Sequence, residues 1–182
     1  MNPAAPAASG AGRRSERGYT LPELLTVMLL LTLVLTALTT VMVSAINAEA
    51  NMNRRYDAQS NARTALTTLR RDVHCASTLT VNSAGSVTIT LPTSCSFGTG
   101  QVTWCTQGAG QRWGLYRVTG ATCSGGTQYA DYVTTSSVFT FTGSVSGTSL
   151  AKLHVDFPVN PSPGSRNSYE LIDDIVLHNS SR

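Results

Sequence analysis

One carboxylate at the start of a long apolar segment differs from every other charge in the sequence. Glu23 directly follows Pro22 and precedes 25 residues without a charge, 24–48. A carboxylate at the edge of a membrane is costly unless it has a partner. Glu23 is therefore a candidate for pairing with a positive group of another molecule, and an acid in a first helical turn also complements the helix dipole. The alternative is that Glu23 merely lies at the level of the lipid headgroups.

Cysteines are the second set of residues with distinctive chemistry. There are four, and all follow the apolar segment: Cys75, Cys95, Cys105 and Cys123. They form no Cys-x-x-Cys pair and no histidine lies at zinc-site spacing, so a metal site is not expected. Four cysteines in an exported domain more often form two disulfides, and three connectivities are open. A hairpin of strands at 102–105 and 114–118 would bring its flanking segments together, which favours a Cys95–Cys123 bond. That bond leaves Cys75 with Cys105.

No set of side chains has the pattern of a catalytic site. The histidines, His74, His154 and His178, are scattered along the chain. Ser149 and Lys152 fit the Ser-x-x-Lys string of penicillin-binding enzymes, but the companion Ser-Asp-Asn and Lys-Thr-Gly strings are absent. The sequence therefore predicts a protein that is not an enzyme.

Two adjacent acids, Asp173 and Asp174, raise the question of calcium. On a strand, neighbouring side chains point to opposite faces. The other nearby acids, Asp131 and Glu170, add no spacing that would complete a calcium site. We therefore favour solvated carboxylates over a weak calcium site and expect no cofactor.

Aromatic residues and arginines are dense in the middle of the chain. The set is Trp104, Trp113, Tyr116, Tyr129 and Tyr132, with Arg112 and Arg117. Such residues can stack on a ligand or on single-stranded DNA. In a β-domain, aromatic side chains more often pack in the core and across strands, and we favour that interpretation.

The composition excludes several classes of protein. Charged residues make up 13% of the 182 residues, against about 25% in an average soluble domain. The 25 Thr and 20 Ser residues suit strands that face water, and the pattern excludes a coiled-coil rod or an acidic disordered tail. The net charge of +3 falls to +1 without residues 1–18, which argues against nucleic-acid binding by bulk charge.

The elements that must position these residues begin with a membrane helix. Segment 1–18 is rich in Ala, Pro, Ser and Gly and carries three arginines, which favours the cytoplasm for this end. As a helix, segment 24–48 would be about 37 Å long, enough to cross a bilayer core of about 30 Å. Arg54 and Arg55 follow it and act against that orientation.

Two other interpretations of the apolar segment stay open. One is an ordinary signal anchor. The other is a cleaved secretory signal, since Val43-Ser44-Ala45 is a small-residue site of the kind that signal peptidase accepts. Against cleavage there, the apolar run is longer than the usual signal-peptide core of about 7–15 residues.

The helix is predicted to continue from about Thr20 to His74, because Pro22 is the only proline in that range and glycine is absent from it. Beyond residue 48, apolar residues recur at spacings of three and four. They are Ala58, Ala62, Ala65, Leu66, Leu69 and Val73. Charged residues, Asp72 among them, are expected mostly on the other faces. The second half of the helix would thus place a narrow apolar stripe on a globular domain.

Hydroxyl residues recur every four positions within the apolar segment: Thr32, Thr36, Thr40 and Ser44. These hydroxyls can bond a neighbouring helix or the backbone of their own helix. We favour the second.

From residue 77 onward the apolar period shifts towards two, which predicts strands. The expected strands are 79–81, 87–91, 102–105, 114–118, 129–133, 138–141, 153–157 and 170–178. The last has a short helix as its alternative, and 158–165 is expected to be a loop. An antiparallel sheet packed on the second half of the helix gives one core and an α+β fold.

The string around Glu23 resembles a known processing signal. It reads Arg17-Gly18-Tyr19-Thr20-Leu21-Pro22-Glu23-Leu24-Leu25 and resembles the prepilin signal of type IV pilins and type II secretion pseudopilins. Tyr19 replaces the commoner Phe of that family. Pro22 replaces an aliphatic residue, a change that a first helical turn tolerates. Segment 62–73 also resembles the corresponding helix of J-type minor pseudopilins and of the larger minor pilins.

This resemblance implies a processing history. A membrane aspartyl peptidase, the prepilin peptidase, would cut between Gly18 and Tyr19 and methylate the new amine of Tyr19. In a filament, Glu23 of one subunit would neutralise the N-terminus of a neighbour, which offsets the burial cost of an unpaired ion.

The implied protein is a minor pilin or pseudopilin with a lollipop shape. Its parts would be a leader (1–18), a transmembrane and filament-core helix (19–48), an amphipathic continuation (49–76) and an exported β-rich domain (77–182). It would cross the bacterial inner membrane once, with its N-terminus in the cytoplasm, and then join a periplasmic or cell-surface filament.

The implied partners are other pilin or pseudopilin subunits, prepilin peptidase, an inner-membrane assembly platform and membrane lipid. DNA is a partner only if the filament serves an uptake system. The competing interpretation is a plain signal-anchored or secreted extracytoplasmic binding module.

Overall fold

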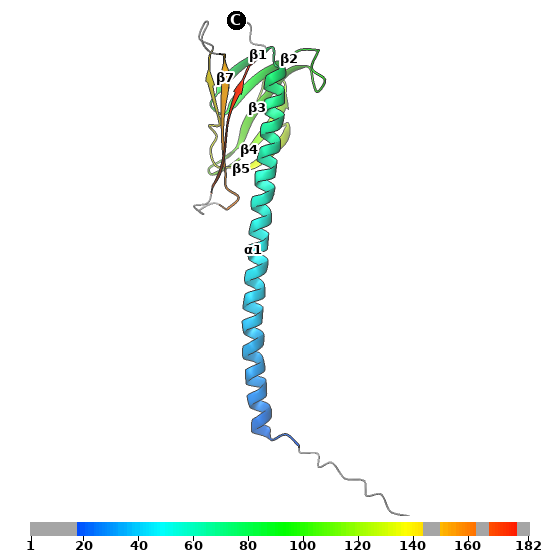
Figure 1. The fold of residues 1–182 in the computed structure, drawn as a ribbon, viewed down its shortest axis with the longest axis vertical. Coiled ribbons are helices and arrows are strands. Elements are labelled where there is room, and N and C mark those ends of the chain that lie inside the picture. Colours follow the sequence, from blue (N-terminus) through cyan, green and yellow to red (C-terminus); the bar gives the residue numbers. More distant parts are fainter. Residues whose placement is uncertain (1–17, 144–149, 163–167, 178–182) are drawn as a thin grey trace, which may run out of the picture. The chain divides into compact units, whose positions relative to one another are not determined.

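The fold consists of one long helix followed by an antiparallel sheet (Figure 1). A computed structural model describes residues 18–143, 150–162 and 168–177. These residues form two compact units that divide between Asn47 and Ala48. The predicted leader before Gly18, and the positions Ser149 and His178, lie outside the described residues. The α+β class predicted from the sequence is confirmed.

The helix α1, Leu21–Cys75, contributes to both units. Its part in the first unit is exposed at every position. Among the described residues, α1 is the one helix long and apolar enough to cross a membrane, with a mean hydropathy of 2.4 over its most apolar window. An exposed apolar helix of this length fits a segment that anchors the chain in a membrane.

Threonine hydroxyls in the first unit bond the backbone of their own helix. Thr36 donates to the carbonyl of Thr32 at 2.7 Å, and Thr39 donates to that of Leu35 at 2.8 Å. Thr32 and Thr40 donate to carbonyls three residues back. The favoured interpretation of this stripe is confirmed for these threonines.

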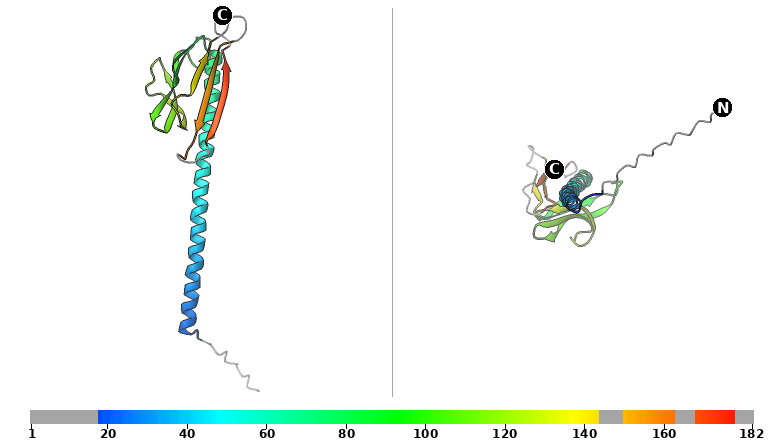
Figure 2. Two further views of the ribbon diagram at one scale, coloured as in Figure 1. Left: turned by 90° about the vertical axis from the view of Figure 1, so that its left-hand side faces the viewer. Right: turned by 90° about the horizontal axis from the view of Figure 1, so that it is seen from below.

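In the second unit, α1 packs along one face of the sheet (Figure 2). All six residues of the predicted apolar stripe are buried: Ala58, Ala62, Ala65, Leu66, Leu69 and Val73. The prediction for Asp72 is wrong, because this residue has no exposed surface. Asp72 follows Leu69 by three positions and Ala65 by seven, so it lies on the same face of the helix as the stripe.

Eight strands follow the helix and match the eight predicted segments to within a few residues. They are β1 (Thr78–Ser83), β2 (Ser86–Leu91), β3 (Gly100–Ala109), β4 (Arg112–Thr119), β5 (Thr127–Val133), β6 (Phe139–Thr142), β7 (Lys152–Val159) and β8 (Tyr169–Val176). The short helix considered for the last segment is not formed. The predicted loop at 158–165 is wrong at its start, because Val159 is buried and pairs with Val133, which extends β7.

All strand pairs are antiparallel, and β1 to β5 pair in chain order. β7 then pairs along its whole length with β8 on one side. On its other side it pairs with β6 near its start and with β5 at Val159. β8 is therefore an edge strand among the described strands. Its inner face contacts α1, where Asp173 forms an ion pair with Arg70 at 2.6 Å.

The segment before β6 closes back on the β1–β2 turn. The backbone N–H groups of Val138 and Phe139 both donate to the carbonyl of Ala84, at 2.9 and 2.8 Å. Gly85 allows this approach, since a Cβ there would lie 2.5 Å from the carbonyl oxygen of Ser136. The contact needs glycine because no side chain fits that gap.

Two disulfides are present, Cys75–Cys95 and Cys105–Cys123, so the predicted pairing is wrong. The hairpin of β3 and β4 forms as expected, but Cys105 lies inside it, opposite Tyr116. The connection after β4 folds back over β3, where Gln107 donates to the carbonyl of Gly125 at 2.9 Å. This fold-back brings Cys123 to Cys105.

The other disulfide forms where the helix meets the sheet. The N–H of Ser77 donates to the carbonyl of Thr90 at 2.9 Å, which sets the end of α1 beside the end of β2. The loop after β2 then carries Cys95 to Cys75, with their Cα atoms 6.2 Å apart. That separation is ordinary for a disulfide.

Candidate functional site

The predicted processing site lies just before α1. Gly18, Tyr19 and Thr20 have neither helical nor strand structure, and Tyr19 is 79% exposed. A Cβ at Gly18 would meet no atom within 4 Å. Nothing in the described fold therefore requires glycine at position 18, and any such requirement must come from a binding partner. The Gly18–Tyr19 bond is open to an enzyme.

Glu23 lies in the first turn of α1. The carbonyl of Thr20 accepts hydrogen bonds from the N–H groups of Glu23 and Leu24, at 3.0 and 3.2 Å. Thr20 thus precedes the first helical residue and Glu23 is the third, which is the spacing of a capping box. Among the described residues, no ion pair involves the Glu23 carboxylate.

Asp72 is the centre of a buried polar cluster that the sequence did not predict. Its Oδ2 accepts from Trp104 Nε1 at 2.9 Å and from Arg117 Nε at 2.7 Å. The Arg117 side chain is 19% exposed and that of Asp72 is fully buried. The cluster connects α1 to β3 and β4. It holds the helix on the sheet.

The aromatic residues in this region pack mainly as core, as favoured from the sequence. Trp104 is fully buried and its ring centroid lies 5.0 Å from that of Tyr129. Arg117 is committed to Asp72. A stacking surface for single-stranded DNA, the alternative, would therefore lack Arg117 and one of its two tryptophans, Trp104.

A second cluster lies where β4 meets β5. Arg112 Nη2 lies 2.7 Å from Asp131 Oδ2, and its guanidinium stands 4.5 Å from the centre of the Tyr132 ring. The N–H of Tyr132 donates to Asp131 Oδ1 at 2.7 Å. Tyr132 has a φ of 62°, a left-handed conformation that costs energy for an aromatic residue. The Arg112–Asp131 pair supports this strained bulge.

The charge state of Asp131 gives a prediction for acid. Burial raises the pKa of Asp131, but the hydrogen bonds from Arg112 and the Tyr132 N–H, with the charge of Arg112, hold that pKa below its ordinary value. Ionised Asp131 therefore stabilises the fold fully at pH values above its pKa in the unfolded chain, about 3.9. This stabilisation is lost as the pH falls through the lower pKa of Asp131 in the folded chain. We expect the urea midpoint of the wild type to fall between pH 5 and pH 2. Arg112→Gln should reduce that fall, and an identical pH profile would contradict this account.

The adjacent acids of β8 face opposite ways, as predicted. Asp173 pairs with Arg70 of α1. Asp174, on the outer face, lies 2.9 Å from Lys152 Nζ and 2.7 Å from His154 Nδ1, and these hydrogen bonds lower the pKa of Asp174. Both acids are thus paired with bases rather than merely solvated. Within the described ranges, no three His, Cys, Asp or Glu residues are grouped to hold a metal ion.

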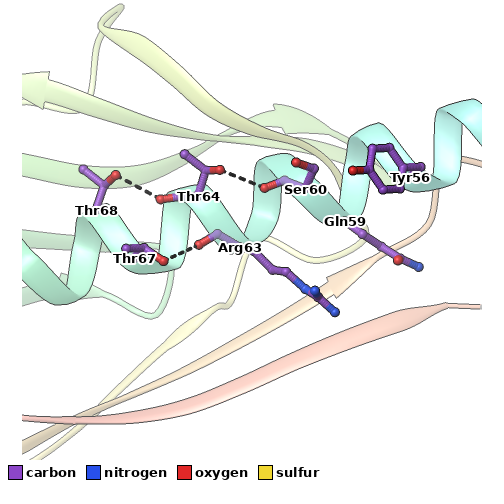
Figure 3. Close-up of a pocket in the computed structure, with 7 residues that line it drawn as sticks. All are labelled: Tyr56, Gln59, Ser60, Arg63, Thr64, Thr67 and Thr68. Carbon is purple, nitrogen blue, oxygen red and sulfur yellow. Dashed lines mark hydrogen bonds between the residues drawn. The ribbon is translucent and has the colours of Figure 1, made fainter.

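The exposed side of α1 in the second unit carries a shallow hollow of about 340 Å³ (Figure 3). We call it the helix hollow, and its lining is Tyr56, Gln59, Ser60, Arg63, Thr64, Thr67 and Thr68. The three threonines donate to backbone carbonyls of α1 at 2.9 Å. They therefore offer methyl groups and acceptor oxygens to a partner. No sequence pattern distinguishes this surface, because polar residues on an exposed helix face are ordinary.

Comparison with protein families adds one finding. Residues 13–39 match the family model described as the prokaryotic N-terminal methylation motif. The matched segment contains the predicted cleavage bond, Glu23 and the first turns of α1. The chain thus carries a prepilin signal like that of type IV pilins and pseudopilins. No curated protein and no solved structure matches the chain significantly.

Proposed function

We propose that this chain is a structural subunit, a minor pilin or pseudopilin, of a filament related to type IV pili or to type II secretion. Prepilin peptidase cuts it between Gly18 and Tyr19 and methylates Tyr19. The observation that carries the proposal is the match of residues 13–39 to the N-terminal methylation motif. It coincides with an accessible cleavage bond and an exposed apolar helix.

The proposed path starts in the inner membrane. The chain crosses it once through the apolar part of α1, with the leader in the cytoplasm and the sheet outside, where two disulfides suit an oxidising compartment. After cleavage, the assembly platform moves the subunit from lipid into the filament. The role requires no cofactor and no catalysis by this chain.

Mass spectrometry of the mature N-terminus tests the proposal. We expect a chain that begins at N-methylated Tyr19. Gly18→Val is the matched variant, because a side chain at this position meets no atom of the described fold. It should leave folding unchanged while blocking the cut.

Two other termini would contradict the proposal. A mature chain that begins at Ile46 would indicate a secreted protein, and an intact Met1 would indicate a plain signal anchor. Genes beside this one distinguish secretion, pilus and DNA-uptake systems, and DNA is a proposed partner only in the last case.

A further inference from the structure

We propose that the helix hollow of one subunit binds an acid-flanked isoleucine on the sheet of the next copy of this chain. This inference rests on the proposed filament function and names the partner surface. The occupant is Ile172 of β8, which stands between two carboxylates on the outer face of the sheet.

The helix hollow combines a positive charge with the ring of Tyr56 and the methyl groups of its threonines. Tyr56 is 73% exposed, and Arg63 is exposed beside it. Arg63 donates to the hydroxyl of Tyr169 at 2.9 Å, but no described carboxylate pairs with it. A guanidinium has five N–H donors in a fork that suits a carboxylate. The hollow therefore fits an apolar side chain that has an acid next to it.

The outer face of β7 and β8 presents such a group. Ile172 is 58% exposed and lies opposite Asp156, and Glu170 precedes it by two positions on the same face. Neither Asp156 nor Glu170 forms an ion pair with a described residue, and Oδ1 of Asp156 is shielded from solvent without a hydrogen bond. We call these three residues the acidic patch. Because Glu170 lies opposite Pro158, the two acids are diagonal neighbours across β7 and β8, and their like charges favour a cation beside them.

The two surfaces cannot meet within one subunit. The helix packs on the inner face of the sheet, where Arg70 reaches Asp173, and Ile172 points to the outer face. A contact between the hollow of one copy and the patch of another is therefore heterologous. A heterologous contact forms a ring if its rotation closes and an open helical array if it does not. The open array is the arrangement that a filament requires.

Charge reversal in the full-length chain tests the contact. Arg63→Glu and Glu170→Arg should each lower the amount of chain in sheared filaments about fivefold. The combined variant restores opposite charges across the contact and should recover most of that loss. Recovery is a result that independent surface defects would not give.

Two matched variants separate pairing from other effects. Arg63→Glu with Glu49→Arg has the net charge of the rescued chain, but position 49 lies about 21 Å along the helix from position 63. It should not recover assembly. Tyr169→Phe removes the partner of Arg63 within the subunit and should leave assembly unchanged.

A photo-crosslinking residue in place of Tyr56 identifies the occupant. We expect a product of two copies joined to the peptide around Ile172. Crosslinks to another protein, or to another region of this chain, would overturn the proposal, as would singly reversed variants that assemble normally. Failure of the proposed function is distinct, because wild-type chain would then lack methylated Tyr19 and be absent from filaments.

Discussion

Asp72→Ala should lower the free energy of unfolding of the second unit by about 3–5 kcal/mol. The substitution leaves the Arg117 guanidinium, 19% exposed, without its counter-ion, and it removes the acceptor of the Trp104 N–H. Removing one member of a buried pair costs this much because the remaining charge stays desolvated. The measurement is a urea titration of the purified full chain in detergent, with both disulfides intact, followed by tryptophan fluorescence.

Two control variants isolate the buried pair. Asp57→Ala removes an exposed acid from the same helix and should change stability by less than about 0.5 kcal/mol. Asp72→Leu with Arg117→Met replaces both charges by apolar groups and should cost less than Asp72→Leu alone. If the single and double variants lose the same stability, the pair does not couple the helix to the sheet.

Patterns within short segments predicted most of the fold. The period of two after residue 77 located all eight strands. Burial alternates strictly along β7, whereas residues 102–105 of β3 are all buried. The i, i+3 and i+4 apolar spacing likewise located the helix face that packs on the sheet. These patterns do not show which elements, or which cysteines, lie next to each other in the fold. The return of the β4–β5 connection over β3 decides both disulfides, and no local spacing encodes it.

Asp72 shows how a local rule failed. A charged residue was assigned to the solvent faces because of its type, although its spacing from Leu69 and Ala65 places it on the buried face. The partner that makes its burial tolerable, Arg117, is 45 residues away. The burial of Asp72 could have been predicted from two observations together. An acid lies in register with an apolar helix stripe, and an arginine lies on a predicted core strand.

The processing signal was predictable for the opposite reason. Gly18, Tyr19 and Glu23 lie close together in the sequence, within the segment that matches the methylation motif, so the motif can be identified without any tertiary structure. The acidic patch is different, since it is assembled from residues on two strands, whereas the helix hollow lies on α1 alone. Only the register of β7 with β8 shows that Asp156 and Ile172 are neighbours.

Glu23→Ala should leave cleavage intact and lower incorporation into filaments by more than about tenfold. Asp72 has its counter-ion within the chain, whereas no described residue pairs with Glu23. A positive N-terminus buried among apolar helices needs a carboxylate from a neighbour, because an unpaired buried ion costs several kcal/mol. The measurement compares sheared filaments with the membrane fraction, together with mass spectrometry of the mature N-terminus.

Glu23→Gln separates this charge from a purely local role. Glutamine at the third helical position serves a capping box as well as glutamate does, so this variant keeps the start of α1 intact while removing the negative charge. If the Glu23 carboxylate pairs with the N-terminus of a neighbouring subunit, Glu23→Gln should fail to assemble, as Glu23→Ala does. Glu23→Asp keeps the negative charge and should retain part of the incorporation into filaments. If Gln assembles normally and only Ala fails, Glu23 acts by capping its own helix, and the charge-pairing explanation is wrong.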